Sequence, residues 1–305
     1  MKAYLFKKIT QMVVVLLGIT LVVFSILHLV GDPVQLLLPP SASQENVEQL
    51  REEMGFNDPL LVQYGRFLSG IFRGDFGMSY NYNQPALSVV LERVPQTLKL
   101  AGIAFLISLV IGIPTGVLSA IKQDTVTDAV IRVLSFLGQC TPSFLLGIMM
   151  MLLFSVKLKW LPTSGNDGWK NIIMPSLTLG LFSTATIIRL LRSNMIEVME
   201  KEFIEVARAK GLKYRLIVWK HGFKNAFSSV MTVLGMQIVS LMGGAVIIET
   251  VFAWPGIGRL AVQSIRNNDF MVTETIVILM ASCFVVMNLI VDLLYAVINP
   301  RVKVQ

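Results

Sequence analysis

Residues 100–121 read LAGIAFLISLVIGIPTGVLSAI and contain no charged side chain. A helix rises about 1.5 Å per residue, so a run of this length crosses a hydrocarbon layer about 30 Å thick. Gly112, Pro114 and Gly116 lie inside the run, and such residues permit close packing and local kinks in membrane helices. The stretch therefore predicts a transmembrane helix.

Similar runs recur along the chain, at 9–30, 133–156, 172–188, 226–248 and 275–298. The run at 172–188 is the shortest, and the last run is interrupted by one acid, Asp292. The first run follows three lysines but is longer than the apolar core of a signal peptide, so we expect a retained anchor helix. We expect an all-α integral membrane protein with six transmembrane helices, forming a single domain over 1–305.

Composition agrees with a membrane location. Of the 305 residues 54% are apolar and only 15% are charged, and the mean hydropathy is +0.68. A soluble domain carries about 25% charged residues, so this chain has too few charges to cover a surface that faces water. The sequence therefore excludes an ordinary soluble enzyme or binding domain.

The net charge of +7 is distributed unevenly among the segments between the runs. With the N-terminus inside, the inner segments hold 16 basic and six acidic residues, whereas the outer segments hold 10 basic and 11 acidic residues. Basic residues collect in cytoplasmic loops, so both termini are expected to be cytoplasmic. The positive charge thus indicates orientation, and we expect membrane lipid and no nucleic acid as a partner.

Catalytic and metal-binding patterns are missing from the sequence. The two cysteines lie within apolar runs and the two histidines are far apart, so we expect no metal site. The chain contains no G-x-S-x-G, H-E-x-x-H or G-x-x-x-x-G-K-[ST] motif. We expect a protein that is not an enzyme, has no ATPase site of its own and receives energy from a partner.

Two segments between the runs are large enough to act as working surfaces: the outer segment 31–95 and the inner loop 189–225. The inner loop has nine basic residues and is expected to be helical around Ile196 to Lys210, with a stop at Gly211. A small apolar stripe with a basic end follows from the spacing of Phe203, Val206, Ala207 and Lys210.

This helix suits a groove on a soluble partner. Ala207 would let that partner approach, Gly211 would permit the left-handed turn that ends the helix, and Glu205 and Arg208 would add polar contacts at the rim. The alternative is a basic loop beside anionic lipid head groups, which accounts better for the lysines that follow Gly211.

The inner loop contains EVARAKG at 205–211 and HGFKNA at 221–226. This pattern resembles the cytoplasmic signature loop of the permease subunits of bacterial ATP-binding-cassette importers, in the dipeptide, oligopeptide and nickel group. Further segments agree in order: GDP at 31–33, GDFGMS at 74–79, WLPTSG at 160–165, MPSL at 174–177, ETVFAWPGIG at 249–258, DLLY at 292–295 and NPR at 299–301. Two departures are Val206, where the signature has alanine, and Ser228-Ser229, where the group usually has a Leu-Pro or Ile-Pro pair.

The resemblance implies a type I importer permease fold in a bacterial inner membrane, with the loop around Glu205–Gly211 transmitting movement from ATPases. It implies a heterodimer with a similar permease, two cytoplasmic ATPase subunits that bind ATP and Mg²⁺, and an extracytoplasmic solute-binding protein. This chain would bind no cofactor itself. Short peptides are the expected cargo, with glutathione, nickel or a metal chelate as alternatives. An ion-coupled secondary transporter and a membrane anchor are the rival classes.

Small and polar residues within the runs suggest a wide, weakly selective pathway, namely Thr141, Pro142, Ser143, Gly243 and Gly244. Glu249, near the outer mouth, would either attract a cationic group or act in a gate, or else cap or pair with a neighbouring loop. Asp292 needs a partner inside the membrane, and Arg189 or Arg192 is the preferred one.

Overall fold

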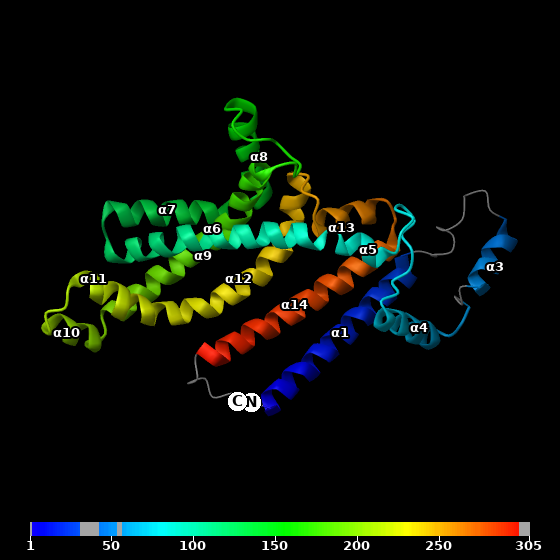
Figure 1. The fold of residues 1–305 in the computed structure, drawn as a ribbon, viewed down its shortest axis with the longest axis horizontal. Coiled ribbons are helices and arrows are strands. Elements are labelled where there is room, and N and C mark those ends of the chain that lie inside the picture. Colours follow the sequence, from blue (N-terminus) through cyan, green and yellow to red (C-terminus); the bar gives the residue numbers. More distant parts are fainter. Residues whose placement is uncertain (1, 31–42, 54–56, 299–305) are drawn as a thin grey trace. The chain divides into compact units, whose positions relative to one another are not determined.

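A computed structural model describes residues 2–30, 43–53 and 57–298 (Figure 1). Within these ranges the regular structure is helical: α1 (Lys2–Val30), α3 (Gln44–Glu53), α4 (Leu60–Arg73), α5 (Ala86–Leu91), α6 (Val94–Ile121), α7 (Val126–Cys140), α8 (Ser143–Met150), α9 (Ile173–Met199), α10 (Glu202–Ala209), α11 (Tyr214–Leu216), α12 (Lys224–Val251), α13 (Ile257–Arg266) and α14 (Phe270–Ile298). Two π-helical segments, Met151–Lys157 and Ile217–Phe223, and one 3-10 turn, Trp169–Ile172, join them. The predicted all-α class is confirmed.

Five helical segments of the described chain are long and apolar enough to cross a membrane: Lys8–Ile26, Ala86–Ile121, Trp169–Met199, Tyr214–Val251 and Phe270–Val291. A sixth candidate is the pair Val126–Cys140 and Ser143–Lys157, which is bent by 105°. The run expected as one span at 133–156 is therefore divided between two helices at a sharp angle.

The bend has a local cause. Pro142 has no N–H to continue the helix, and proline disfavours helical backbone at the residue before it. Thr141 accordingly has φ −78° and ψ 123°, and its hydroxyl donates to the Leu137 carbonyl oxygen at 2.7 Å. The hydropathy pattern extends through this point because threonine and proline add no charge.

The chain divides into two compact units, one within residues 1–95 and 260–289 and the other within 96–259 and 290–303. The single membrane domain expected from the sequence stays a prediction. In the first unit α4 packs on α1: the Thr20 and Tyr64 hydroxyls are 2.9 Å apart, and the ring of Phe24 contacts those of Tyr64 and Phe67. The outer segment thus includes a helix attached to the first span.

A second contact in this unit ties the outer turn 74–85 to the beginning of α14. The Ser79 hydroxyl donates to Asp269 Oδ2 at 2.5 Å, and Asn81 donates to the same oxygen through its backbone N–H and its side-chain amide. Asp269 is fully buried and also accepts from the Val272 N–H at the helix start. Burial, together with the negative charge of Asp269, raises the pKa of Tyr80. The predicted outer segment is therefore an ordered structure at this point.

In the second unit α9 is the central helix, with α6, α7 and α12 against it (Figure 1). A Cβ placed on Gly180 would lie 2.7 Å from the Ala104 carbonyl oxygen, so glycine permits α6 to approach closely. The buried core at the cytoplasmic half contains Val117, Ile187, Leu191, Met195, Val198, Val218, Ala226, Val230 and Leu234. This packing extends α9 to Met199, well beyond the predicted end at residue 188.

Candidate functional site: a helix-break pocket and a cytoplasmic loop

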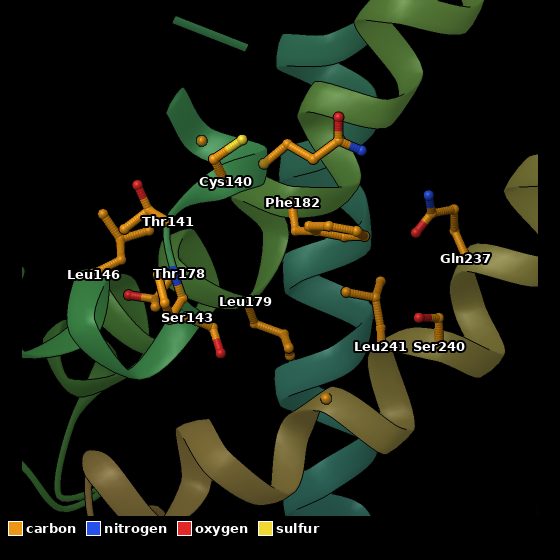
Figure 2. Close-up of a pocket in the computed structure, with 14 residues that line it drawn as sticks. Cys140, Thr141, Ser143, Leu146, Thr178, Leu179, Phe182, Gln237, Ser240 and Leu241 are labelled. Atoms are coloured by element: carbon orange, nitrogen blue, oxygen red, sulfur yellow. The ribbon is translucent and has the colours of Figure 1, made fainter. Parts of the chain in front are cut away.

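The bend at Thr141–Pro142 forms one wall of a pocket of about 320 Å³ (Figure 2). Its lining comes from the end of α7, the beginning of α8, the first third of α9 and the middle of α12. The lining residues are Gly138, Gln139, Cys140, Thr141, Pro142, Ser143, Leu146, Thr178, Leu179, Phe182, Gln237, Ser240, Leu241 and Gly244. The pocket thus lies where the broken pair α7 and α8 meets α9 and α12.

The pocket combines neutral hydrogen-bonding groups with apolar walls. Figure 2 shows Thr141 and Ser143 on the side of the helix break and Gln237 and Ser240 on α12. The Thr178 hydroxyl donates to the Met174 carbonyl oxygen at 2.7 Å, so it is held by its own helix. Glutamine amides both donate and accept, which suits a ligand that carries both kinds of group.

Four of the predicted pathway residues line this pocket, namely Thr141, Pro142, Ser143 and Gly244. Gly243 is not among the lining residues. Gln139 and Gln237 were missed, although each was visible as an uncharged polar residue in an apolar run. The contribution of Phe182 and Ser240 had no signal in the sequence, because only the packing of α9 and α12 brings them to the break.

Glu249 lies elsewhere, buried at the end of α12. One carboxylate oxygen accepts from the Thr97 hydroxyl at 2.6 Å, and the other accepts from the Arg259 N–H at 3.1 Å. The Gly258 N–H also donates to this carboxylate, and the Ile257 N–H donates to Thr97 Oγ1 at 2.8 Å. The predicted pathway role for Glu249 therefore has no support here. The geometry is that of the capping alternative, because these donors begin α13.

Two side chains that follow Glu249 in the sequence hold the turn between α12 and α13. Trp254 is buried and donates its indole N–H to the Gln96 carbonyl oxygen at 3.0 Å, and the Arg259 guanidinium donates to the Ala253 carbonyl oxygen at 2.5 Å. The segment ETVFAWPGIG thus folds back on the beginning of α6.

The inner loop contains a short separate helix. The expected helix over Ile196 to Lys210 is interrupted, because α9 ends at Met199 and α10 begins at Glu202. The predicted stop at Gly211 is confirmed: this residue has φ +70°, its N–H donates to Arg208, and the Leu212 N–H donates to the Ala207 carbonyl oxygen. These two bonds form the left-handed helix end for which glycine is favoured.

The predicted apolar stripe of α10 is divided between two faces. Ala207 is buried with Ile204 and Ile217, and so it packs inward instead of facing a partner. Phe203 and Val206 are exposed, at 41% and 53% of their full surface. Ile204, which the sequence analysis did not single out, is the fully buried residue that holds the helix. The exposed face therefore consists of Phe203 and Val206 together with the charged residues Glu205, Arg208 and Lys210.

A buried ion pair joins three helices at the cytoplasmic side. Asp128 on α7 is fully buried and accepts from Arg192 Nε at 2.7 Å and Arg192 Nη2 at 2.8 Å. The Ser119 hydroxyl of α6 donates to it at 2.6 Å, and the Asp124 N–H at 3.1 Å. Arg192, one of the two partners expected for Asp292, is therefore already paired with Asp128. The side chain of Asp292 lies outside the described residues.

The fold and these sites together define a multi-pass membrane transport subunit. The chain belongs to the family of binding-protein-dependent transport system inner membrane components, whose model matches residues 112–304, and the N-terminal model of the same systems matches residues 1–101. It is accordingly an inner-membrane permease of the ATP-binding-cassette importer class, as the sequence motifs predicted.

Relatives match along the whole chain. It is 35% identical to the dipeptide transport system permease protein DppB of Alkalihalophilus pseudofirmus, over 99% of this chain and 100% of that protein. It is 36% identical to the glutathione transport system permease protein GsiC of Salmonella paratyphi A, over 98% of both chains.

Solved structures show the same fold. An inward-facing MetNI methionine ABC transporter matches with a TM-score of 0.58 at 18% identity, over 70% of this chain and 97% of that chain. An amino acid ABC transporter with histidines matches with a TM-score of 0.55 at 15% identity, over 68% of this chain and 93% of that chain. The predicted type I importer permease fold is confirmed.

Proposed function

We propose that this chain forms half of the translocation channel of an ATP-driven importer for dipeptides and oligopeptides. The pocket at the Thr141–Pro142 break carries this proposal, since it lies among helices of membrane-spanning length and joins neutral amide and hydroxyl groups to apolar walls. A peptide backbone presents donors and acceptors at regular intervals, whatever its side chains. Such lining binds the shared backbone without strong selection among side chains.

Glutathione is the second candidate cargo, because relatives of closely similar identity are named as glutathione permeases. Glutathione is itself a peptide and carries the same amide groups. We assign the choice between these cargos to the solute-binding protein, which is a separate chain.

We assign coupling to the loop of Phe203, Glu205, Val206, Ala207, Arg208, Lys210 and Gly211, with two kinds of contribution. Phe203 and Val206 form the exposed apolar contact for an ATPase groove, and the charged residues surround it. Ala207 and Gly211 preserve the shape of the helix, one by packing inward and the other by its left-handed backbone.

The proposed machine contains a second, homologous permease in a heterodimer, two cytoplasmic ATPases that bind ATP and Mg²⁺, and an extracytoplasmic solute-binding protein. The chain itself has no ATPase site and binds no cofactor. ATP binding closes the two ATPases and moves both coupling loops, which turns the channel from inward-open to outward-open. Hydrolysis then resets the channel.

Reconstitution with cognate partners tests the cargo. Proteoliposomes that contain both permeases and both ATPases are supplied with loaded binding protein, and uptake of labelled dipeptide, tripeptide, glutathione and Ni²⁺ is measured with and without ATP. We expect peptide uptake that requires ATP. Uptake that persists without nucleotide and stops when an ion gradient is removed would instead establish a secondary transporter.

A pair of matched substitutions tests the coupling surface. Val206→Glu places a charge on the exposed face of α10, and Val126→Glu places the same charge on an exposed valine of the neighbouring inner segment. We expect Val206→Glu alone to reduce uptake and transport-linked ATP hydrolysis by about tenfold or more, as burial of an unpaired charge at an interface implies. Equal effects of the two substitutions would contradict the assignment.

A further inference from the structure

The ion pair between Asp128 and Arg192 stands between the coupling loop and the pocket. Arg192 lies on α9, seven residues before Met199, and α10 follows within three residues. Met199 packs against the inward face of α10 that contains Ile204 and Ala207. Movement of α10 is therefore transmitted directly to the cytoplasmic end of α9.

The main neighbour of α7 is α9, and not α10. Within α7, all of which the structure describes, Asp128 is the single buried residue. Most of its apolar side chains are exposed, including Val133 at 57%, Leu134 at 62% and Phe136 at 65%. The Asp128 carboxylate is therefore the one fully buried polar attachment of α7, and it adds to the packing of this helix along α9.

A second point of attachment lies at the other end of α7. A Cβ placed on Gly138 would be 3.3 Å from Leu181 Cγ on α9, so the helices are in close contact there. Asp128 and Gly138 are ten residues apart, which corresponds to about 15 Å along a helix. α7 thus packs along α9, with the ion pair near its beginning and the close contact at Gly138 near its end. Its last turn supplies Gly138, Gln139 and Cys140 to the pocket.

We infer that the Asp128–Arg192 pair is a mechanical clamp through which α9 carries α7 with it, so that movement of the coupling loop opens and closes the pocket at the Thr141–Pro142 break. Asp128 and Arg192 are positioning residues, since neither lines the pocket. The bidentate geometry suits this task, because two parallel hydrogen bonds fix orientation as well as distance. The inference rests on the proposed function and extends it to residues outside the loop and the pocket.

The test uses the assembled importer in lipid nanodiscs and proteoliposomes. Removing one partner leaves a buried charge and threatens folding, so the principal variant replaces both residues, as Asp128→Leu with Arg192→Met. Apolar replacement of a whole buried pair is often neutral for stability. Arg132→Gln is the matched control, because Arg132 is 53% exposed on the same helix and lies 3.5 Å from Asp128 without linking α7 to α9.

The first measurement is the amount of peptide imported for each ATP hydrolysed. We expect the double variant to assemble normally and to lower this ratio by roughly threefold to thirtyfold, the range found when coupling residues are altered. The control is expected to keep the ratio within about twofold. An unchanged ratio in an assembled double variant, or an equal loss in the control, overturns the clamp.

The second measurement does not require transport. After Cys140→Ser and Cys283→Ser, spin labels are attached at Phe136→Cys on α7 and Arg189→Cys on α9, and their distance is measured with and without a non-hydrolysable ATP analogue. We expect one narrow, nucleotide-independent distance with the clamp intact and a broadened or shifted distance in the double variant. If the distance distribution between the labels is the same in the double variant as in the protein with the intact pair, the pair is not a clamp. If the intact importer moves no peptide, the proposed function fails, and this distance still decides the clamp.

Discussion

Two carboxylates of the second unit, Glu249 and Asp128, are both fully buried and yet are stabilised in different ways. Glu249 accepts hydrogen bonds from a hydroxyl and from backbone N–H groups that lie within ten residues of it or on α6. Asp128 accepts two bonds from a guanidinium 64 residues away. The first carboxylate has only neutral partners and holds the turn that begins α13 against α6, whereas the second forms an ion pair between α7 and α9.

The difference shows that burial of an acid in a membrane protein does not by itself define its role. Both acids avoid the cost of an unpaired charge in an apolar medium. Glu249 accepts from the backbone at the beginning of α13 and from Thr97, and so it fixes this turn against α6. Asp128 accepts from a guanidinium of another helix, and so it pairs α7 with α9 through opposite charges.

The largest expected effect comes from Asp128→Ala. This change leaves the Arg192 guanidinium, which is only 20% exposed, without its anion. Breaking a buried pair on one side costs about 3–5 kcal/mol, so we expect a large fall in the thermal unfolding midpoint of the purified protein. A loss below about 1 kcal/mol would show that the pair is hydrated and would weaken the contrast with Glu249.

A smaller effect is expected from Glu249→Ala. The hydroxyl of Thr97 and the N–H groups of Gly258 and Arg259 lose their acceptor, at a cost of about 3 kcal/mol in total. Glu249→Gln keeps an acceptor oxygen and is the control, with less than half of that loss. Circular dichroism during heating measures both. If Glu249→Gln abolishes uptake in a stable protein, the charge of Glu249 acts in transport and the capping role is insufficient.

Gly258→Ala tests the same turn by adding a methyl group to it, whereas Glu249→Ala removes a carboxylate. A Cβ at this position would lie 2.4 Å from Val246 Cα and 3.0 Å from Glu249 Oε2, so the backbone has to shift. Overpacking of this kind costs about 2 kcal/mol. Gly102→Ala on α6, where a Cβ has no neighbour within 4 Å, is the control and is expected to be neutral. Equal stability of the two variants, measured by thermal unfolding, would show that the backbone of the turn shifts at little cost in free energy.

The smallest effect is expected from Arg132→Gln. Its guanidinium approaches Asp128 at 3.5 Å but is half exposed, so the pair contributes less than about 1 kcal/mol. Thermal unfolding should therefore distinguish it clearly from Asp128→Ala. A loss as large as that of the alanine variant would assign the clamp to Arg132 within α7 and would remove the link to α9.

Much of the architecture was accessible from particular residues. The uncharged runs predicted the membrane helices because a helix that crosses lipid contains few charges. Gly211 predicted the helix end because glycine is favoured where the backbone adopts a left-handed conformation. Pro142 is a residue type that bends membrane helices, but the sequence did not predict the angle of 105°, since the hydropathy of 133–156 is continuous.

The site was only partly accessible. Periodicity placed Ala207 on the same stripe as Phe203 and Val206, and it could not distinguish the side that packs on Ile217 from the side that stays exposed. Asp128 was counted as an ordinary charge of an inner segment, because its distance in sequence from Arg192 concealed the pair.

By itself the sequence determined the family, most of the membrane helices and the end of α10, because these follow from motifs, from composition and from contacts between neighbours in the chain. Only the tertiary structure decided which polar residues meet. The pocket at the helix break, the cap formed by Glu249 and the pair between Asp128 and Arg192 all join residues far apart in sequence, and the packing of the helices brings these residues together.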